Sequence, residues 1–291
     1  MKYYAPTSLA QALELLENLS GEKNVLLAGG TDIVPKMKSN PARSGWYDKY
    51  DASATDFNMI YLGNLGLSYI TCDEKGDLHI GALTTMSDIL ASSLADKVPV
   101  LKQALSQLAG LTIRNMATIG GNAMNASPAA DSVPALIALG AVAVFAGKSG
   151  QRAEPVEQIF QGPGKTDIRP GEILTEFIIP KPAGKGSFEK LGRRKGETLS
   201  VVNGAAQADM SGTHCNCIRI AIGSVAPTPL RLEKIEKMLE GKDVTEELIA
   251  QAAEAVADEI SPIDDIRGSA EYRKKVAKVV VKRVVAGACL Q

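Results

Sequence analysis

The chain has 291 residues, which is enough for about two domains. Hydrophobic residues make up 45% of it, the usual share for a protein with a sizeable core. The 32 Lys and Arg residues are balanced by 33 Asp and Glu residues, so the net charge of -1 offers no field for nucleic acid. No apolar run approaches the ~20 residues of a membrane helix. The N-terminus does not resemble a signal peptide and four cysteines are too few for a disulfide scaffold, which predicts a cytoplasmic protein.

The first part of the chain predicts a small lobe over residues 1–55. Apolar side chains recur on one helical face of residues 8–19, and Thr7 or Ser8 is suited to cap that helix. A short apolar run then ends at two glycines, which is typical of a strand that enters a tight turn. The expected elements are a helix over 8–19, a strand over 25–28, a short helix over 33–38 and a loop over 39–55.

Residues 56–180 predict a second lobe, and residues 181–291 a separate C-terminal domain. The border lies in the proline- and glycine-rich run over 180–186, whose composition is typical of a linker. In the second lobe we expect strands over 59–62, 68–72, 78–81 and 141–146, and helices over 85–94, 100–111 and 131–140. In the C-terminal domain we expect strands over 187–191, 201–210 and 217–225, followed by helices over 229–239, 245–260 and 270–289. Strands first and helices last are typical of an α+β domain.

Two turns with paired glycines are the most informative feature of the sequence. They are Leu26-Leu27-Ala28-Gly29-Gly30-Thr31-Asp32 and Ala117-Thr118-Ile119-Gly120-Gly121-Asn122. Glycine lacks a Cβ, so the backbone amides of such turns can point outward and form a concave anion site. Two facing turns suit a pyrophosphate, because four or five amides at about 1.5–3 kcal/mol each hold a dinucleotide without Lys or Arg. Plain tight turns are the alternative for each glycine pair.

The better-known nucleotide and metal motifs do not occur in this sequence. No strand is followed by the G-x-G-x-x-G fingerprint of Rossmann domains. The run Gly164-Lys165-Thr166 ends like a P-loop, but Ile159 stands where that motif needs its first glycine. His214, Cys215 and Cys217 lack the spacing of a zinc site, and the two histidines of the chain leave little for nucleophilic catalysis. We therefore expect no metal site and no catalytic residue.

The two glycine turns resemble those of the FAD-binding subunits of molybdenum hydroxylases. That family includes the flavin subunits or domains of xanthine dehydrogenase, carbon monoxide dehydrogenase and nicotinate dehydrogenase. The segments LLAGGTD and IRNMATIGGNAMNASPAADSVPALIALGA carry the resemblance. It is supported by the later segments GPGKTDIRPGEILTEFIIP, FEKLGRRKGETLSVVNGAAQ, RIAIGSVAPTPLRL and RGSAEYRKKVAKVVVKRVV. The resemblance runs in order along nearly the whole chain.

This resemblance implies an α+β fold, with a two-lobed FAD-binding domain of the vanillyl-alcohol oxidase type. An α+β C-terminal domain would follow, with a three-stranded antiparallel sheet and a helix bundle. The resemblance also implies one noncovalent FAD and an oxidoreductase subunit that transfers electrons. An iron–sulfur subunit would supply the electrons, a molybdopterin subunit would oxidise the organic substrate, and an external acceptor would receive the electrons from FAD. A free-standing flavin oxidoreductase and a non-redox nucleotide-binding assembly module are the alternatives.

The resemblance further assigns residues to the cofactor. The two turns would hold the pyrophosphate, Asp131 would serve the adenosine side of FAD, Leu174 would make an apolar contact, and Lys190 would place a cation near the flavin. The matching positions are Val25, Leu26, Leu27, Ala28, Gly29, Gly30, Thr31, Asp32, Thr118, Ile119, Gly120, Gly121, Asn122, Asp131, Leu174 and Lys190. Alternatively, Asp131 caps a helix, Leu174 is a core residue of a strand and Lys190 is a solvated surface lysine.

Several features set this chain apart from relatives in the same family. Residues 192–200 match a loop that can cover the flavin ring, with Arg193 and Arg194 either near the acceptor or in a solvated basic turn. There is no cysteine-rich insertion for an iron–sulfur cluster, and neither turn has a histidine for covalent attachment of flavin. Leu108 stands where xanthine dehydrogenase relatives have an aromatic side chain near the flavin, so the stacking partner and the reactivity toward NAD stay open.

Overall fold

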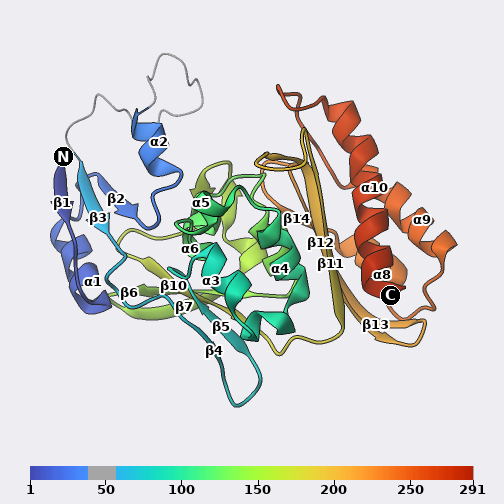
Figure 1. Cartoon of the computed structure of the whole chain (residues 1–291), viewed down its shortest axis with the longest axis horizontal. Helices are drawn as coiled ribbons and strands as arrows, with labels where there is room; N and C mark the ends of the chain where they lie inside the picture. The colour runs from blue at the N-terminus through green and yellow to red at the C-terminus, as the bar shows by residue number, and fades with distance from the viewer. Residues whose placement is uncertain (39–56, 291) are drawn as a thin grey trace.

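The computed structural model describes residues 1–38 and 57–290, and its parts follow one another along the long axis of the molecule (Figure 1). A small sheet with two helices lies at the left, a larger sheet with several helices in the middle, and a long sheet backed by the last helices at the right. The expected mixture of helix and sheet is confirmed. Among the described residues, no helix combines the length and the apolar character needed to cross a membrane.

Three parallel strands form the first sheet, in the order β1-β3-β2. The elements of this part are β1 (Lys2–Tyr4), α1 (Leu9–Asn18), β2 (Asn24–Leu27), α2 (Ile33–Lys38) and β3 (Asn58–Tyr61). Ser8 caps α1, since its side chain accepts a hydrogen bond from the amide of Gln11. The strand expected at the start of the second lobe, β3, pairs with both strands of the first. The loop expected over 39–55 lies outside the described residues.

The middle part is built on a five-stranded sheet in the order β4-β5-β10-β6-β7, in which each neighbouring pair is antiparallel. Its strands are β4 (Ile70–Cys72), β5 (Leu78–Gly81), β6 (Val142–Gly147), β7 (Gly150–Pro155) and β10 (Ile173–Ile179), and a separate hairpin joins β8 (Phe160–Gly162) to β9 (Lys165–Thr166). Its helices are α3 (Met86–Ala91), η2 (Leu94–Lys97), α4 (Pro99–Ser106), α5 (Leu111–Arg114), α6 (Ile119–Met124), α7 (Ser132–Ala138) and η3 (Val156–Gln158).

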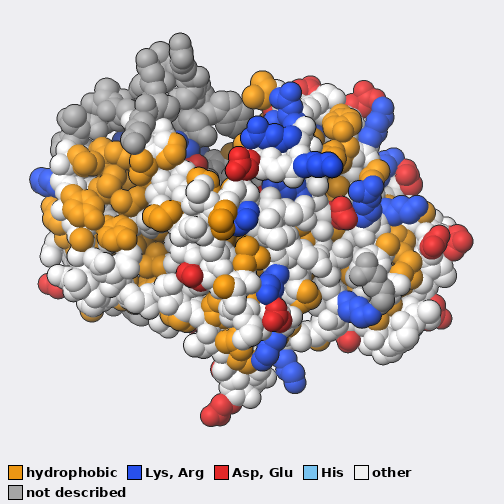
Figure 2. Space-filling model, in the orientation of Figure 1, with side chains coloured by type: hydrophobic (Ala, Val, Ile, Leu, Met, Phe, Trp, Pro, Cys, Tyr) orange, Lys and Arg blue, Asp and Glu red, His pale blue; other side chains and the backbone are white. Residues whose placement is uncertain are grey.

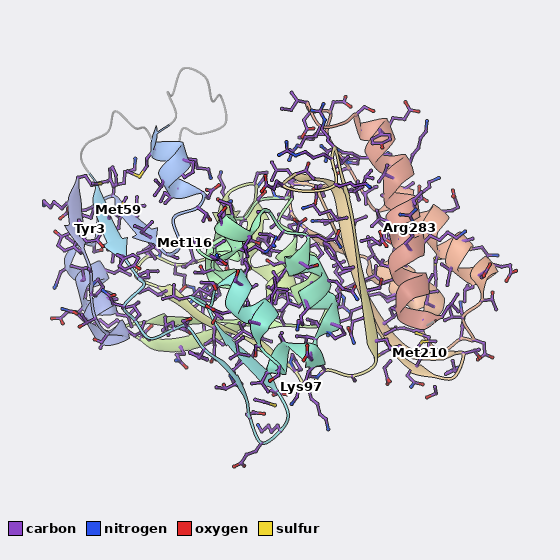
Figure 3. All side chains as sticks on the ribbon, in the orientation of Figure 1. Tyr3, Met59, Lys97, Met116, Met210 and Arg283 are labelled. Atoms are coloured by element: carbon purple, nitrogen blue, oxygen red, sulfur yellow. The ribbon has the colours of Figure 1, made fainter. Side chains whose placement is uncertain are left out.

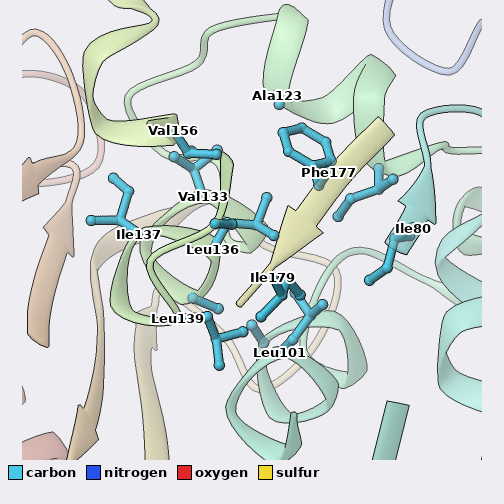
Figure 4. Packing of buried hydrophobic residues seen from close by; sticks show 14 of the residues in the cluster. Ile80, Leu101, Ala123, Val133, Leu136, Ile137, Leu139, Val156, Phe177 and Ile179 are labelled. Carbon is cyan, nitrogen blue, oxygen red and sulfur yellow. The ribbon is translucent and has the colours of Figure 1, made fainter. Parts of the chain in front are cut away.

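The core of the middle part lies between this sheet and its helices. Ile80 of β5 and Phe177 of β10 belong to one buried cluster with Leu101 of α4 and Leu136 of α7 (Figure 4). The helix expected over 100–111 ends earlier, at Ser106. Ala109 adopts a left-handed backbone with φ 45°, which a right-handed helix cannot continue, and α5 starts anew beyond it.

The C-terminal sheet has four strands, in the order β11-β12-β13-β14, so the expectation of three strands is wrong. The elements are β11 (Lys185–Gly192), β12 (Ser200–Ser211), β13 (His214–Gly223), β14 (Leu230–Arg231), α8 (Glu233–Leu239), α9 (Glu246–Ala255), η4 (Val256–Asp258) and α10 (Ala270–Cys289). The helix expected from residue 229 begins only at Glu233, because Leu230 and Arg231 pair with Ile222 and Ala221 at the edge of the sheet.

Both faces of the C-terminal sheet are covered. On one face, β12 and β13 share a buried cluster with α8, α9 and α10. On the other face, Phe188, Ala205 and Ala221 extend into the core of the middle part. The sheet therefore packs the last helices against the middle part, which carries the second glycine turn.

Candidate cofactor site

The two glycine turns lie against each other. A Cβ added at Gly29 would come within 1.8 Å of the carbonyl oxygen of Met116, directly before the second turn. A Cβ added at Gly121 would lie 3.7 Å from the Cβ of Ala28. Figure 3 labels Met116 on the side of the middle part that faces the N-terminal sheet. The sequence-based expectation of two facing turns therefore agrees with this geometry, although the turns are far apart in the chain.

The first turn keeps its backbone amides available. It connects β2 to α2, and Gly30 takes the left-handed conformation with φ 71°. Within the described parts of the chain, no hydrogen bond uses the amide N–H of any residue from Ala28 to Asp32. All five residues are partly exposed. The Asp32 carboxylate forms an ion pair with Lys36, which reduces the repulsion that an anion in this turn would meet.

The amides of the second turn are already used inside the protein. Those of Ile119 and Gly120 donate to the carbonyls of Thr84 (3.0 Å) and Ala82 (2.9 Å). Those of Gly121 and Asn122 donate to the side chain (3.1 Å) and the carbonyl (3.0 Å) of Thr118, which caps α6. The prediction that both turns present their amides outward is therefore wrong for these four residues.

The glycines of the second turn instead allow close packing. A Cβ at Gly120 would lie 2.7 Å from both the Cβ and the carbonyl oxygen of Ala82, which follows β5. This contact brings the second turn down onto the end of the five-stranded sheet. The carbonyl of Thr175 in β10 accepts from the amide of Ala82 at 2.8 Å, next to the buried Leu174. Leu174 thus lies in the core, at the strand that supports this turn.

The donor set fits a diphosphate group. The first turn offers a row of amides that no other described residue uses, on a partly exposed backbone. Hydrogen bonds from such amides to a charged oxygen are worth about 1.5–3 kcal/mol each. The second turn lies opposite the first. Gly121 has no side chain there, and only Ala28 and Thr118 lie near the position that its Cβ would take. The residues present therefore suit the pyrophosphate of FAD, with the first turn as the main source of donors.

Asp131 and Lys190 form a buried ion pair, with 2.6 Å between the Lys190 ammonium and Oδ2 of Asp131. Asp131 precedes α7, but its side chain does not cap that helix. Its Oδ1 accepts from the Ser200 hydroxyl (2.5 Å) and from Nδ2 of Asn203 (2.7 Å). The Lys190 ammonium also donates to the carbonyl of Gln107 at 3.0 Å. Lys190 is thus neither solvated nor unpaired.

Asp131 and Lys190 therefore lie together, although the resemblance assigns one to the adenosine side of FAD and the other to the flavin. Ser200 and Asn203 were not among the sequence-based site residues. The available signal was their polarity within the apolar run of β12, where both are fully buried.

The loop over 193–199, between β11 and β12, lies beside the segment that leads to the second turn. A Cβ at Gly110, which precedes α5, would come within 2.3 Å of Oε1 of Glu197. The Arg193 and Arg194 guanidinium groups donate to backbone carbonyls, of Ile266 (3.2 Å) and of Gly196 (3.0 Å) respectively. Lys and Arg side chains gather at the upper end of the C-terminal part in Figure 2, where this loop lies in Figure 1.

Other chemistry is sparse in the described residues. No group of three or more His, Cys, Asp or Glu side chains in residues 1–38 and 57–290 could hold a metal ion. Leu108, at the position that is aromatic in some relatives, is buried in the core of the middle part. Its carbonyl accepts from the Arg114 guanidinium at 2.9 Å, which holds α5 in place.

Comparison with known proteins gives the same picture for the whole chain. Residues 1–182 match the family model described as the FAD binding domain in molybdopterin dehydrogenase. Residues 187–288 match that of the CO dehydrogenase flavoprotein C-terminal domain. The chain is 36% identical to the carbon monoxide dehydrogenase medium chain of Afipia carboxidovorans, over 97% of this chain and 94% of that protein. It is 30% identical to the xanthine dehydrogenase FAD-binding subunit of Escherichia coli O157:H7, over 98% and 95%.

Solved structures agree over the full length. A chain of the Cu,Mo-CO dehydrogenase in its cyanide-inactivated form has a TM-score of 0.90 at 34% identity, with 100% of this chain and 98% of that chain covered. A chain of quinoline 2-oxidoreductase from Pseudomonas putida 86 has a TM-score of 0.87 at 28% identity, with 100% and 97% covered.

Proposed function

Because this chain belongs to the family of FAD-binding subunits of molybdopterin dehydrogenases, we propose that it is the electron-transfer subunit of a molybdenum hydroxylase. In this proposal electrons arrive from an iron–sulfur subunit, leave to an external acceptor, and come originally from a substrate oxidised on a molybdopterin subunit. The names of the relatives, a medium chain and a FAD-binding subunit, support a role as one part of a larger enzyme. The three domains expected over 1–55, 56–180 and 181–291 remain part of this proposal, as does a cytoplasmic location.

One observation carries the proposal for this chain's own residues. The amides from Ala28 to Asp32 have no hydrogen-bond partner among residues 1–38 and 57–290, at the place where Gly29 lies against Met116 and Ala28 faces Gly121. This arrangement binds a diphosphate through the backbone, so it depends on the absence of side chains at the glycines. When bound, FAD supplies the redox chemistry, and the chain supplies binding and orientation. The other site residues expected from the resemblance stay predictions.

The turn is tested by Gly29→Ala, with Gly147→Ala as the matched control. A Cβ at Gly29 would overlap the carbonyl of Met116 at 1.8 Å, so the backbone must move and the amides lose their alignment. A Cβ at Gly147 makes only ordinary contacts, the nearest at 3.4 Å. We expect Gly29→Ala to bind FAD at least about tenfold more weakly, which is 1.4 kcal/mol, and Gly147→Ala to bind it like the unmodified chain. Equal affinity in all three chains, measured by flavin fluorescence titration, contradicts the proposed site.

The redox role is tested on the FAD-loaded chain. We expect a yellow protein that dithionite reduces and that does not oxidise purines or aldehydes by itself. Turnover of such a substrate by the isolated chain favours the free-standing oxidoreductase, and a chain without reducible flavin favours the non-redox module. Co-purification of partners, followed by analysis for molybdenum and iron, tests the expected assembly.

A further inference from the structure

The last helix, α10, has more apolar surface than the fold of this chain uses. Its inner face belongs to the buried cluster that it shares with the C-terminal sheet and α9. On its outside, Tyr272, Val279 and Leu290 are 48%, 49% and 45% exposed. A helix at a protein surface normally has one apolar face, directed at the core, and polar residues opposite it. A second row of large apolar side chains in water therefore indicates a contact with another molecule.

The three exposed residues lie on one line along the helix. Val279 follows Tyr272 by seven residues and precedes Leu290 by eleven, which is close to two and three full helical turns. Three further residues fill this line, namely Val276, Arg283 and Ala286. The steps from Tyr272 to Leu290 thus alternate between four and three residues, which is the spacing of a coiled-coil seam. We call these six residues the α10 seam, which is about 27 Å long at 1.5 Å per residue.

The middle of the seam is not interrupted by its one charged residue. Arg283, labelled in Figure 3, is 65% exposed, and its guanidinium lies 3.7 Å from the carboxylate of Glu189 in β11. The methylene stem of an arginine covers apolar surface while its charged end stays in water. Val276 and Ala286 are partly buried against the C-terminal core. The seam is therefore a narrow apolar row rather than a broad apolar face.

One side of the seam is positively charged. Lys275, Lys278 and Lys282 run beside it at spacings of three and four residues, so they share one side of the helix. In all, α10 has five basic side chains outside the core and one acidic side chain, whereas the whole chain has a net charge of -1. Glu271 pairs with Lys275 and Glu254 with Lys278, but no carboxylate among residues 1–38 and 57–290 pairs with Lys282. The side of the seam thus keeps an excess of positive charge.

We propose that the α10 seam is the docking surface for an acidic amphipathic helix of a partner protein. Such a helix places its apolar row on the seam and its carboxylates beside Lys275, Lys278 and Lys282. A narrow row suits a single helix, whereas a membrane surface needs a broad apolar face. A second copy of this chain would bring the same excess of lysines to the contact, and like charges disfavour it. This inference goes beyond the proposed function, because it requires a partner but no redox role.

The seam is tested on the full chain with two labelled synthetic peptides of three heptads each. Both have Leu at positions a and d, and they differ in having Glu or Lys at e and g, where like charges keep each peptide from pairing with itself. Binding is measured by fluorescence anisotropy. We expect the Glu peptide to bind at least about tenfold more tightly than the Lys peptide, equal to 1.4 kcal/mol, and to bind more weakly as salt is raised.

Two variants locate the binding surface, each with a matched control. Val279→Lys places a charge on the seam, and Lys282→Glu reverses a charge beside it; both side chains are exposed, so the fold is kept. The controls are Tyr3→Lys in β1 and Lys75→Glu between β4 and β5, both exposed and far from α10 (Figure 1). We expect each α10 variant to bind the Glu peptide at least about tenfold more weakly, and each control to bind it like the unmodified chain. If Val279→Lys does not fold by circular dichroism, Lys282→Glu decides.

The outcomes separate this proposal from its alternatives and from the proposed function. No binding of the Glu peptide, equal binding of both peptides, or equal binding by the α10 variants and their controls overturns it. A dimer of this chain, or binding to phosphatidylserine vesicles, that Val279→Lys abolishes assigns the seam to another occupant and also overturns it. A chain that binds the Glu peptide at the seam but takes up no FAD supports this inference and refutes the proposed function.

Discussion

Asp265 anchors the segment that precedes the long helix α10. Its carboxylate accepts from the side chain of Arg267 at 2.6 Å and from Arg273 at 2.7 Å. Arg273 is 2% exposed and also donates to the carbonyls of Val201 and Ser224, each at 2.8 Å. Burial by itself raises the pKa of Asp265, but the hydrogen bonds and charge of Arg267 and the hydrogen bond from Arg273 outweigh it and lower this pKa to about 2.

We predict that Asp265→Asn lowers the free energy of unfolding by roughly 2 to 3 kcal/mol at pH 7. The pKa of the carboxyl falls from 3.8 to about 2 on folding, and each pKa unit is worth about 1.4 kcal/mol. A carboxyl with a lowered folded pKa contributes stability above its unfolded pKa and loses it as the pH falls through the folded pKa. The difference between the two chains should therefore be complete above about pH 5, fall to about half at pH 3 and nearly vanish below about pH 2.

The assay is urea unfolding followed by circular dichroism at pH 7, 5 and 3, at constant ionic strength. Glu246→Gln is the control, since this exposed side chain in the first turn of α9 should change stability at pH 7 by no more than about 0.5 kcal/mol. A stability difference between the unmodified chain and Asp265→Asn that is as large at pH 3 as at pH 7 would refute the assigned role of the ion pair.

Three further predictions concern the site, the core and the cysteines. Thr118→Ala removes the cap of α6, so thermal unfolding should show a loss of about 1 kcal/mol, and FAD titration should show weaker binding; unchanged affinity would argue against the second turn. Phe177→Ala should cost about 3–5 kcal/mol in urea unfolding, because the side chain is fully buried, and a loss under 1 kcal/mol would show that the core is not packed as described. Burial raises the pKa of the Cys215 and Cys289 thiols to about 12 and about 11, so iodoacetamide at pH 8 should alkylate exposed Cys217 and spare both until urea is added; mass spectrometry that finds Cys215 labelled in the folded chain would contradict this.

Much of the fold follows from local sequence patterns. The apolar face of α1 and the hydroxyl of Ser8 define a helix and its start without any distant contact. The glycine at 212, with φ 65°, marks the turn between β12 and β13. These features depend on residues close together in the chain, so periodicity and turn chemistry are sufficient to predict them.

The errors lie where distant contacts decide. Leu230 and Arg231 continue a helical pattern, but β13 offers them an edge with which to pair. The helix expected to continue through residue 109 ends earlier, because Ala109 takes a left-handed backbone conformation. A helix cap was expected of Asp131, but its carboxylate is taken by Lys190 from another part of the chain.

The sequence by itself determined where backbone without side chains occurs, and so which two turns can approach each other and an anion. It also carried the family resemblance, because the order of motifs along the chain is a one-dimensional property. Only the tertiary structure decided which turn keeps its amides free. The carbonyls of Ala82 and Thr84 occupy the amides of Gly120 and Ile119, while no partner within the described residues reaches those of the first turn. A hydrogen bond is made or left open by the atoms that folding brings within 3 Å or so, and that information is not present in either turn alone.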